Sequence, residues 1–326
     1  MPFKPIKLVP ADTHVPFMAY HRIAMIASAV LMLLSVMLFF GVGLNYGIDF
    51  RGGTLIEIKT DGPADIGELR DELGGLGLGD VQIQTFGAPD DVLIRVQEQP
   101  GGEQAQQVVV EKVRGALGED VEYRRVEVVG PTVSQELIES GTLAVILAIF
   151  AVLVYIWLRF EWQFSVGAVI ALVHDVVLTI GMFSVLQIEF GLPIIAAILT
   201  IVGYSLNDTV VVYDRVRENL RKYKKMPLPD LLDQSVNETL SRTIVTSVAT
   251  LIALLSLYIL GGEVIRGFVF AMIWGVVIGT YSSIFVAAPL LLMLGVKRDW
   301  SGLGGAKIKE PGGQSTASEE ARETAS

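Results

Sequence analysis

Long apolar stretches alternate with short polar connections along most of this chain. Six stretches are long enough to cross a bilayer core, which is about 30 Å thick and needs roughly 20 helical residues. The apolar run of the first, from Ile23 to Phe40, exceeds the usual signal-peptide core of about 7–15 residues, and no small-x-small cleavage site follows it. The pattern therefore predicts a membrane protein with six retained spans. The predicted spans are residues 22–43, 139–158, 163–186, 192–213, 243–261 and 266–294.

Basic residues in the connections predict the orientation, because cytoplasmic loops are enriched in Lys and Arg. The connection 214–242 is strongly basic, and the turn 159–162 contains Arg159. The connections on the other side, 187–191 and 262–265, contain one Glu each and no base. We therefore expect both termini (1–21 and 295–326) and the basic loop 214–242 in the cytoplasm, and residues 44–138 on the outer side.

The outer segment 44–138 is too polar to span a membrane and too regular to be a linker. Its strand candidates are 54–60, 80–86, 91–97 and 121–129, each with partial period-2 alternation, and its helix candidates are 64–73 and 102–117. The order β-α-β-β-α-β predicts an inserted α+β, ferredoxin-like domain, with Ala88-Pro89-Asp90 as the turn between its middle strands. By contrast, residues 302–326 are almost devoid of apolar side chains and are expected to be disordered.

Composition agrees with a membrane protein and excludes several other classes. Hydrophobic residues make up 52% and charged residues 18% of the 326 positions, whereas soluble proteins have about 45–50% and about 25%. Mean hydropathy is +0.54. A net charge of −10 argues against nucleic-acid binding, which needs a basic face. Cysteine is absent and the three His are scattered. We therefore expect no metal site, no cofactor and no enzyme: no nucleophile–base pair or phosphate loop is evident.

Charged residues inside apolar spans are the candidate chemistry, because such residues are costly there and usually line an interior or a water-filled cavity. Asp208 follows Ser205 and Asn207 toward the cytoplasmic end of the fourth span. Arg242 opens the fifth span, followed by a stripe of hydroxyls that includes Thr246. If these spans are antiparallel neighbours, Arg242 and Asp208 lie at similar depth. One acid, one base and a line of hydroxyls are suitable parts for a proton relay.

Other interpretations of these residues stay open from the sequence alone. Asp208 and Arg242 could form a fixed ion pair that holds two helices together, or Arg242 could extend to water as an ordinary interfacial base. The third span carries His174 and Asp175 near its middle. Asp175 could join the proton path or only brace the fourth span, and His174 is better explained as a hydrogen-bonded interior residue.

Several motifs, in order along the chain, resemble the SecF family of the SecD–SecF protein-export complex. The first is 47–54 (GIDFRGGT), with its family residues Gly47, Asp49, Phe50, Gly52 and Gly53. The others are 129–134 (VGPTVS), 160–162 (FEW), His174-Asp175, 199–219 around Asp208, and 239–247 around Arg242. The resemblance extends to about residue 298.

The resemblance implies six transmembrane helices in half of a bundle of the resistance-nodulation-division (RND) type, with residues 44–138 periplasmic. It also implies a place in the bacterial inner membrane among its lipids, pairing with SecD and association with the SecYEG channel. The family uses the proton-motive force to draw exported, unfolded polypeptides outward, with protons as the coupling ion. Its essential acid corresponds to Asp208, and its fifth-span arginine to Arg242.

Two other functions compete with proton-driven protein export. One is a small-molecule exporter subunit of the RND type, although the single outer domain is small and shows no evident aromatic-lined pocket. The other is a non-transporting scaffold of the translocation channel, in which Asp208 would be structural. Asp208→Asn, tested for export without loss of assembly, distinguishes the scaffold from the proton-driven subunit.

Overall fold

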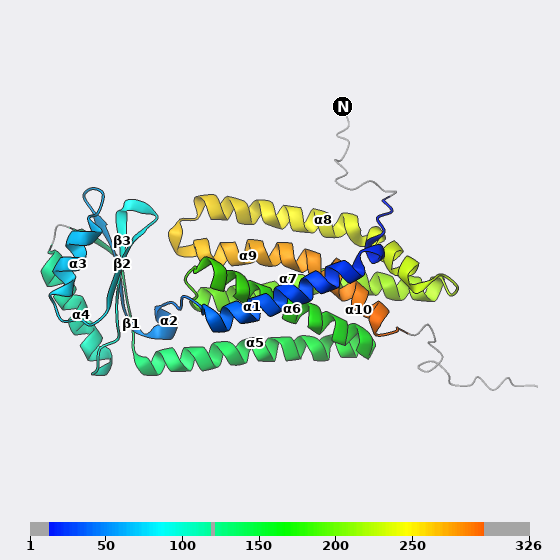
Figure 1. Cartoon of the computed structure of the whole chain (residues 1–326), viewed down its shortest axis with the longest axis horizontal. Helices are drawn as coiled ribbons and strands as arrows, with labels where there is room; N and C mark the ends of the chain where they lie inside the picture. Colours follow the sequence, from blue (N-terminus) through cyan, green and yellow to red (C-terminus); the bar gives the residue numbers. More distant parts are fainter. Residues whose placement is uncertain (1–12, 119–120, 297–326) are drawn as a thin grey trace, which may run out of the picture. The chain divides into compact units, whose positions relative to one another are not determined.

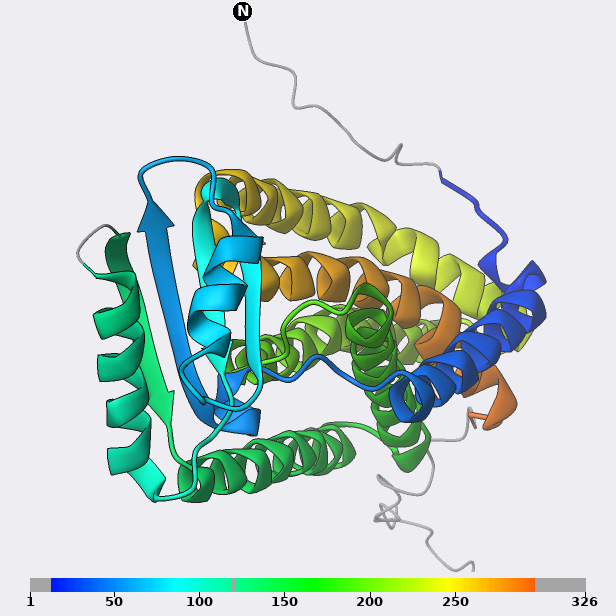
Figure 2. The same ribbon diagram turned by 60° about the vertical axis from the view of Figure 1, so that its left-hand side comes forward.

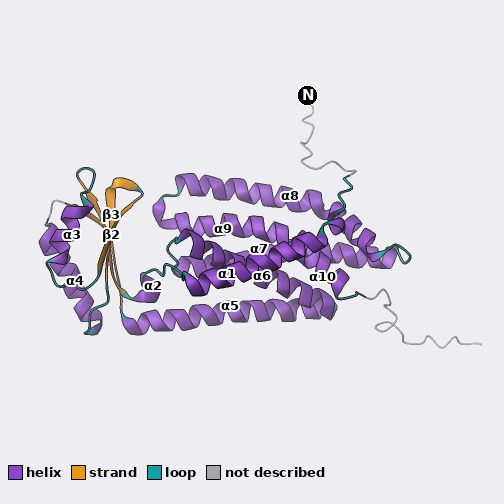
Figure 3. Cartoon of the chain, viewed as in Figure 1, coloured by secondary structure: helices purple, strands orange, loops and turns teal. Residues whose placement is uncertain are grey.

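The structure is a computed structural model that describes residues 13–118 and 121–296. The described residues up to Gly295 belong to one compact unit, and Val296 is the sole described residue of a second. The tail expected at 302–326 lies outside the described residues. Within the compact unit, a bundle of long helices adjoins a small domain that contains all the strands (Figures 1 and 3).

Six helices in the described part of the chain are long and apolar enough to cross a membrane, as predicted. They are α1 (His21–Gly41), α5 (Pro131–Arg159), α6 (Trp162–Leu186), α7 (Leu192–Lys222), α8 (Leu228–Leu260) and α9 (Glu263–Ser282), the last continued by a π-helical turn, η2 (Ser283–Ala287), and by α10 (Ala288–Met293). Two short elements, η1 (Phe17–Ala19) and α2 (Ile48–Arg51), lie before and after α1.

Three of the long helices form the interior of the bundle. In α6, α7 and α9 with its continuation, 56%, 44% and 61% of the most apolar window is buried, against 11% in each of α1, α5 and α8. The peripheral helices α1, α5 and α8 expose large apolar side chains such as Phe40, Leu158 and Leu260. Those faces suit a lipid environment, whereas polar side chains on α6, α7 and α9 are enclosed by protein.

The segment 214–242, expected as a basic loop, is mostly helical, so that expectation is wrong. α7 and α8 continue beyond their apolar parts and pack against each other as a hairpin, leaving only residues 223–227 between them. Leu220 and Leu232 are buried in it, and the Asn219 amide donates a 3.0 Å hydrogen bond to the Ser235 hydroxyl. The charges lie on the outside of an amphipathic pair of helices, a pattern that a count of basic residues does not reveal.

The boundary between the outer domain and the second span also differs from the expected position at residue 138. The last strand ends at Val129, and α5 begins at Pro131, which suits the first turn of a helix because its missing N–H would be unpaired there. Residues 131–138 therefore extend the second long helix instead of belonging to the domain.

The outer domain has the predicted β-α-β-β-α-β order and a ferredoxin-like sheet. The strand order is β2-β3-β1-β4, with antiparallel neighbours throughout. The turn between the middle strands is not at 88–90 as expected: Gly87, with φ +84°, makes it, and Ala88 already pairs with Phe86. The elements are β1 (Gly53–Thr60), α3 (Ile66–Gly74), β2 (Val81–Phe86), β3 (Ala88–Val96), α4 (Gly102–Leu117) and β4 (Val121–Val129).

The two faces of this sheet have different coverings. Ile56, Ile58 and Ile94 are completely buried in a core with side chains of α3 and α4. Figures 1 and 2 show both helices on that one face. The alternate residues Leu55 and Leu93 pack instead with Ile48 of α2, on the face that the two helices leave uncovered. Period-2 alternation thus gives the sheet a helix-covered face and a second face that carries α2.

Candidate functional site

Asp208, the acid expected to carry protons, lies on α7 and is only 3% exposed. It is about 16 residues, or roughly 24 Å along the axis, past the first residue of the helix. Its Oδ2 atom has no hydrogen-bond partner among the described residues. A buried carboxylate oxygen without a partner is unusual and, inside a span, indicates a functional position.

Arg242 lies on α8 and is not paired with the acid. Its side chain is exposed, and no ion pair of 4.0 Å or less joins it to Asp208 within the described ranges. The Arg242 charge acts on Asp208 at longer range. The structure therefore shows no ion pair between Asp208 and Arg242. It places a base at the edge of the bundle and an acid inside it.

A polar cluster around Asp175 joins three helices in the interior. The Asp175 carboxylate accepts hydrogen bonds from the hydroxyls of Ser205 (2.6 Å) on α7 and Ser282 (2.8 Å) on α9, both at Oδ2. Its Oδ1 atom lies 2.9 Å from Nδ1 of His174, the preceding residue on α6. None of the four side chains is more than 1% exposed. Asp175 therefore fastens α7 and α9 to α6, one helical turn from Asp208.

Ser282 is a member of this cluster that was not predicted from the sequence. It ends α9, and the π-helical turn η2 follows it directly. Single π-helical turns interrupt regular helices mostly at functional positions. The only sequence signal was a pair of serines, Ser282 and Ser283, inside an otherwise apolar span.

The other relay candidates do not form a continuous line of hydroxyls. Thr246 is half-buried and donates to carbonyl oxygens of its own helix, those of Arg242 (3.1 Å) and Thr243 (2.9 Å). Asn207 is exposed. Thr243 is buried, and its hydroxyl has no partner among the described residues. The structure thus brings Ser205, Asp175 and Asp208 together and leaves Thr246 and Asn207 outside the cluster.

The family residues of 47–54 lie in the segment that leads from α1 through the short helix α2 to the start of β1. We name residues 45–53 the signature loop. Gly52 and Gly53 have φ of +70° and +110°, a conformation that favours glycine, and a Cβ at Gly53 would contact the carbonyl oxygen of Val96. The two glycines therefore let the chain turn tightly into β1 against β3.

Asp49 and Phe50 of the signature loop contact the start of α7. The Asp49 carboxylate accepts a 2.8 Å hydrogen bond from the backbone N–H of Leu192, the first residue of that helix. The Phe50 ring lies 6.1 Å from the ring of Phe190, centroid to centroid. The signature residues thus have a structural role: they fix the outer domain to the bundle.

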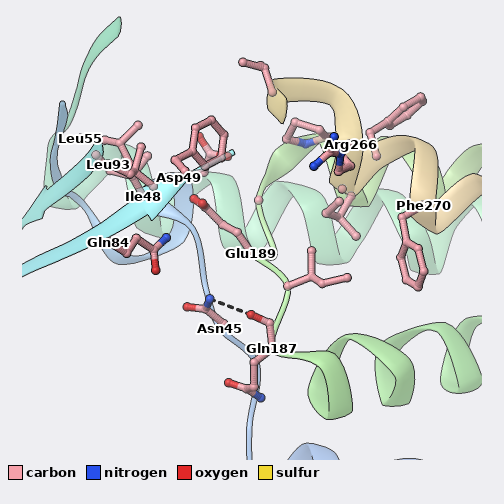
Figure 4. Close-up of a pocket in the computed structure, with 18 of the residues that line it drawn as sticks. Asn45, Ile48, Asp49, Leu55, Gln84, Leu93, Gln187, Glu189, Arg266 and Phe270 are labelled. Carbon is pink, nitrogen blue, oxygen red and sulfur yellow. Dashed lines mark hydrogen bonds between the residues drawn. The ribbon is translucent and has the colours of Figure 1, made fainter. Parts of the chain in front are cut away.

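A cavity of about 460 Å³ lies beside this contact. Figure 4 shows residues of the outer domain, which we also call the sheet domain, on one side of the cavity, among them Leu55 and Gln84. Residues of the bundle, among them Arg266 and Phe270, lie on the other side. Its lining mixes apolar, amide and charged side chains. Among the residues that the structure describes, no group of three or more His, Asp or Glu is arranged to hold a metal ion.

Comparisons with known proteins agree on one family. Residues 109–297 match the family model described as protein export membrane protein SecD/SecF, C-terminal, and residues 38–64 match the SecD/SecF GG motif. The protein translocase subunit SecF of Rhodobacter capsulatus is 48% identical over 309 residues, covering 90% of this chain and 93% of that protein.

Some relatives are much longer than the region that matches this chain. The protein translocase subunit SecDF of Brucella abortus is 46% identical over 298 residues, which are 91% of this chain but 39% of that protein. The crystal structure of SecDF from Thermus thermophilus superposes with a TM-score of 0.79 at 35% identity, over 89% of this chain and 40% of that one. This chain thus spans about two fifths of the length of the SecDF relatives.

Proposed function

This chain belongs to the SecF family of protein translocase subunits, and on that basis we propose that it uses the proton-motive force to help draw exported polypeptides across the membrane. It is a multi-pass membrane protein and an auxiliary subunit without a catalytic centre of its own. A SecD-type chain is its proposed partner, because SecDF relatives combine the matched region with a longer remainder. The proposal includes association with the SecYEG channel in the bacterial inner membrane, both termini in the cytoplasm and the sheet domain outside.

The observation that carries this proposal is the buried, incompletely bonded carboxylate of Asp208. A residue that served only to hold helices together would be expected to have its polar atoms satisfied, as those of Asp175 are. Asp208 instead has a free oxygen beside Ser205 and a base at longer range. An acid in this position can exist with and without its proton, provided that the helices around it shift between the two forms.

The shift that the proposal requires is small and has identifiable parts. With its proton, Asp208 is neutral and suits the apolar interior of the bundle. Without it, the carboxylate needs a donor or a cation, and the nearest candidate base is Arg242 on α8. Movement of α7 relative to α8 would bring the two together. The proton thereby selects between two arrangements of α7, a helix whose first residue is hydrogen-bonded to Asp49 of the outer domain.

Export measured with and without a proton gradient tests the proposal. Inverted vesicles that contain the wild-type complex should export more with the gradient than without it, and Asp208→Asn should abolish that increment while the protein still assembles. The matched control is Asn207→Ala, because Asn207 is polar, exposed and on the same turn. An undiminished increment in Asp208→Asn would refute the proposal and favour a scaffold.

A further inference from the structure

The signature loop pairs with residues 187–191, the connection between α6 and α7. Phe190 donates a backbone hydrogen bond to Asn45 (2.8 Å), and Gly47 donates one to Phe190 (2.9 Å). Tyr46 and Phe190 form a parallel bridge, and the Asn45 amide donates to the Gln187 carbonyl (3.0 Å; Figure 4). The loop that precedes the sheet domain is therefore bound to the connection that precedes α7, although the two are far apart in sequence.

Asp49 completes this contact at the helix itself. The first N–H groups of a helix lack intrahelical partners and carry a partial positive charge, so a carboxylate stabilises them. At the start of α7, the backbone N–H of Leu192 donates a hydrogen bond to the Asp49 carboxylate. The N-cap residue of the helix, Gly191, provides no side-chain cap. Asp49 thus supplies from the outer domain the cap that the sequence of α7 does not provide.

Two glycines allow the carboxylates of this contact to approach the backbone closely. A Cβ placed on Gly191 would lie 2.8 Å from Oδ2 of Asp49, and one placed on Gly47 would lie 2.8 Å from Oε1 of Glu189. Glu189 also pairs with Arg95 of β3 at 3.0 Å, and the Arg95 side chain is only 12% exposed. A second contact, between charged side chains, therefore ties the same connection to the sheet.

We propose that Asp49 is a positioning residue that makes α7 and the sheet domain move together, so that a shift of α7 at Asp208 reorients the outer domain. This inference rests on the proposed function, in which protonation of Asp208 moves α7. The two aspartates act at separate points along the same helix: Asp49 holds the first residue of α7, and Asp208 lies about 24 Å further along it. A helix transmits such a displacement because its backbone hydrogen bonds resist stretching and bending. We name the set of contacts between residues 45–49 and 187–192 the α7 clamp.

Export assays separate transmission from folding. Asp49→Ala removes the cap and should reduce the gradient-dependent increment of export about fivefold, the ratio that corresponds to the loss of one capping interaction. Asp49→Asn should retain most of it, because Asn caps helices about as well as Asp. Gly191→Ala should resemble Asp49→Ala, since its methyl group displaces the carboxylate. The matched control is Asp61→Ala, an exposed acid of the same domain.

Distance measurements give a readout that does not depend on export. The chain has no cysteine, so pairs of introduced cysteines carry spin labels at unique positions. Glu72→Cys with Leu260→Cys reports the sheet domain against the outer end of α8, and Leu158→Cys with Lys225→Cys reports the inner end of α7 against α5. These four positions are exposed. Asp49→Ala should broaden the first distance distribution and leave the second unchanged, whereas Asp49→Asn should change neither.

The two proposals fail in different ways in this experiment. If the first distribution is as narrow in Asp49→Ala as in the wild type, the α7 clamp is not what holds the sheet domain, and the inference is overturned. If Asp208→Asn shifts neither distance, the proposed function is rejected. The width of the first distance distribution in Asp49→Ala still shows whether the α7 clamp holds the sheet domain. Asp208→Asn should shift both distances in the wild-type background and only the second in Asp49→Ala.

Discussion

Asp175 should tolerate replacement by Asn but not by Ala, because of the three groups that it holds. Both of its oxygens accept hydrogen bonds, from His174, Ser205 and Ser282, and no member of the cluster is more than 1% exposed. Asp175→Ala removes an acceptor from three buried groups, of which the Ser282 hydroxyl retains a second acceptor, the carbonyl oxygen of Gly279 at 3.2 Å. An unsatisfied buried group costs about 1–3 kcal/mol. Allowing for local relaxation, we expect a loss of about 3–6 kcal/mol, a large part of the stability of a folded domain.

Asp175→Asn preserves the shape and the three contacts. The amide oxygen in place of Oδ2 accepts from Ser205 and Ser282, while the amide nitrogen in place of Oδ1 donates to Nδ1 of His174 if the imidazole carries its proton on Nε2. We therefore expect a loss of about 1 kcal/mol, the net contribution of a single hydrogen bond. Gradient-dependent export should persist, because Asp175 braces α7 and both of its oxygens are engaged in hydrogen bonds that hold the helices together.

Resistance to unfolding by heat or by SDS, measured on purified protein in detergent, checks the stability order of wild type, Asn and Ala variants. The same preparations returned to vesicles check export. Equal stability of Asp175→Ala and wild type would refute the reasoning about the cluster. Loss of gradient-dependent export in a stable Asp175→Asn protein would show instead that Asp175 belongs to the proton path.

Three further perturbations have defined outcomes. Arg242→Lys keeps the charge but loses the planar guanidinium that suits a carboxylate, so gradient-dependent export should fall although the net charge is unchanged. The double change Asp208→Asn with Arg242→Gln should not export with the gradient either. Restored export in that double variant would refute the proton relay. Gly53→Ala should cost roughly 1–3 kcal/mol through its positive φ and expose the sheet domain to protease, measured as the rate of cleavage. A backbone hydrogen bond and the Lys59 ammonium at 3.3 Å hold the pKa of Asp90 below 3.8. The ionised Asp90 carboxylate therefore contributes to stability at neutral pH, and this contribution is lost as the pH falls through the lowered pKa. Lys59→Gln should move the pKa of the Asp90 carboxyl, followed by NMR, toward 3.8.

Much of the fold followed from hydrophobic periodicity because burial in lipid and burial against a sheet leave clear patterns. The six spans and the order of strands and helices in the outer domain were predicted correctly. The basic segment 214–242 was not, since its helices are stabilised by contact with each other through residues such as Asn219 and Ser235. A charge count shows which side of the membrane such a segment occupies but not whether it is helical.

The candidate site was predictable where a charged residue stands out in an apolar span. It was not predictable where a residue's role depends on contacts between helices that are distant in sequence. Asp208 and Asp175 were found because acids are conspicuous in apolar spans. Ser282 was missed, because a serine is common in a membrane helix and only the register of α9 against α6 brings it to Asp175. The role of Asp49 depends on a contact with Leu192, 143 positions away, for which one sequence contains no signal.

The pairing of β1 with β4 also sets an order of biogenesis. The two strands are bonded along their whole length, from Gly53 opposite Val129 to Thr60 opposite Val121. β1 follows closely after α1 and β4 leads directly into α5, so both strands precede the later spans in the chain and the sheet can close before those spans are made. Closure draws the outer ends of α1 and α5 together, and α6 is the helix that packs against both. Closure of the sheet thereby constrains the spacing of the first two long helices, against both of which α6 packs.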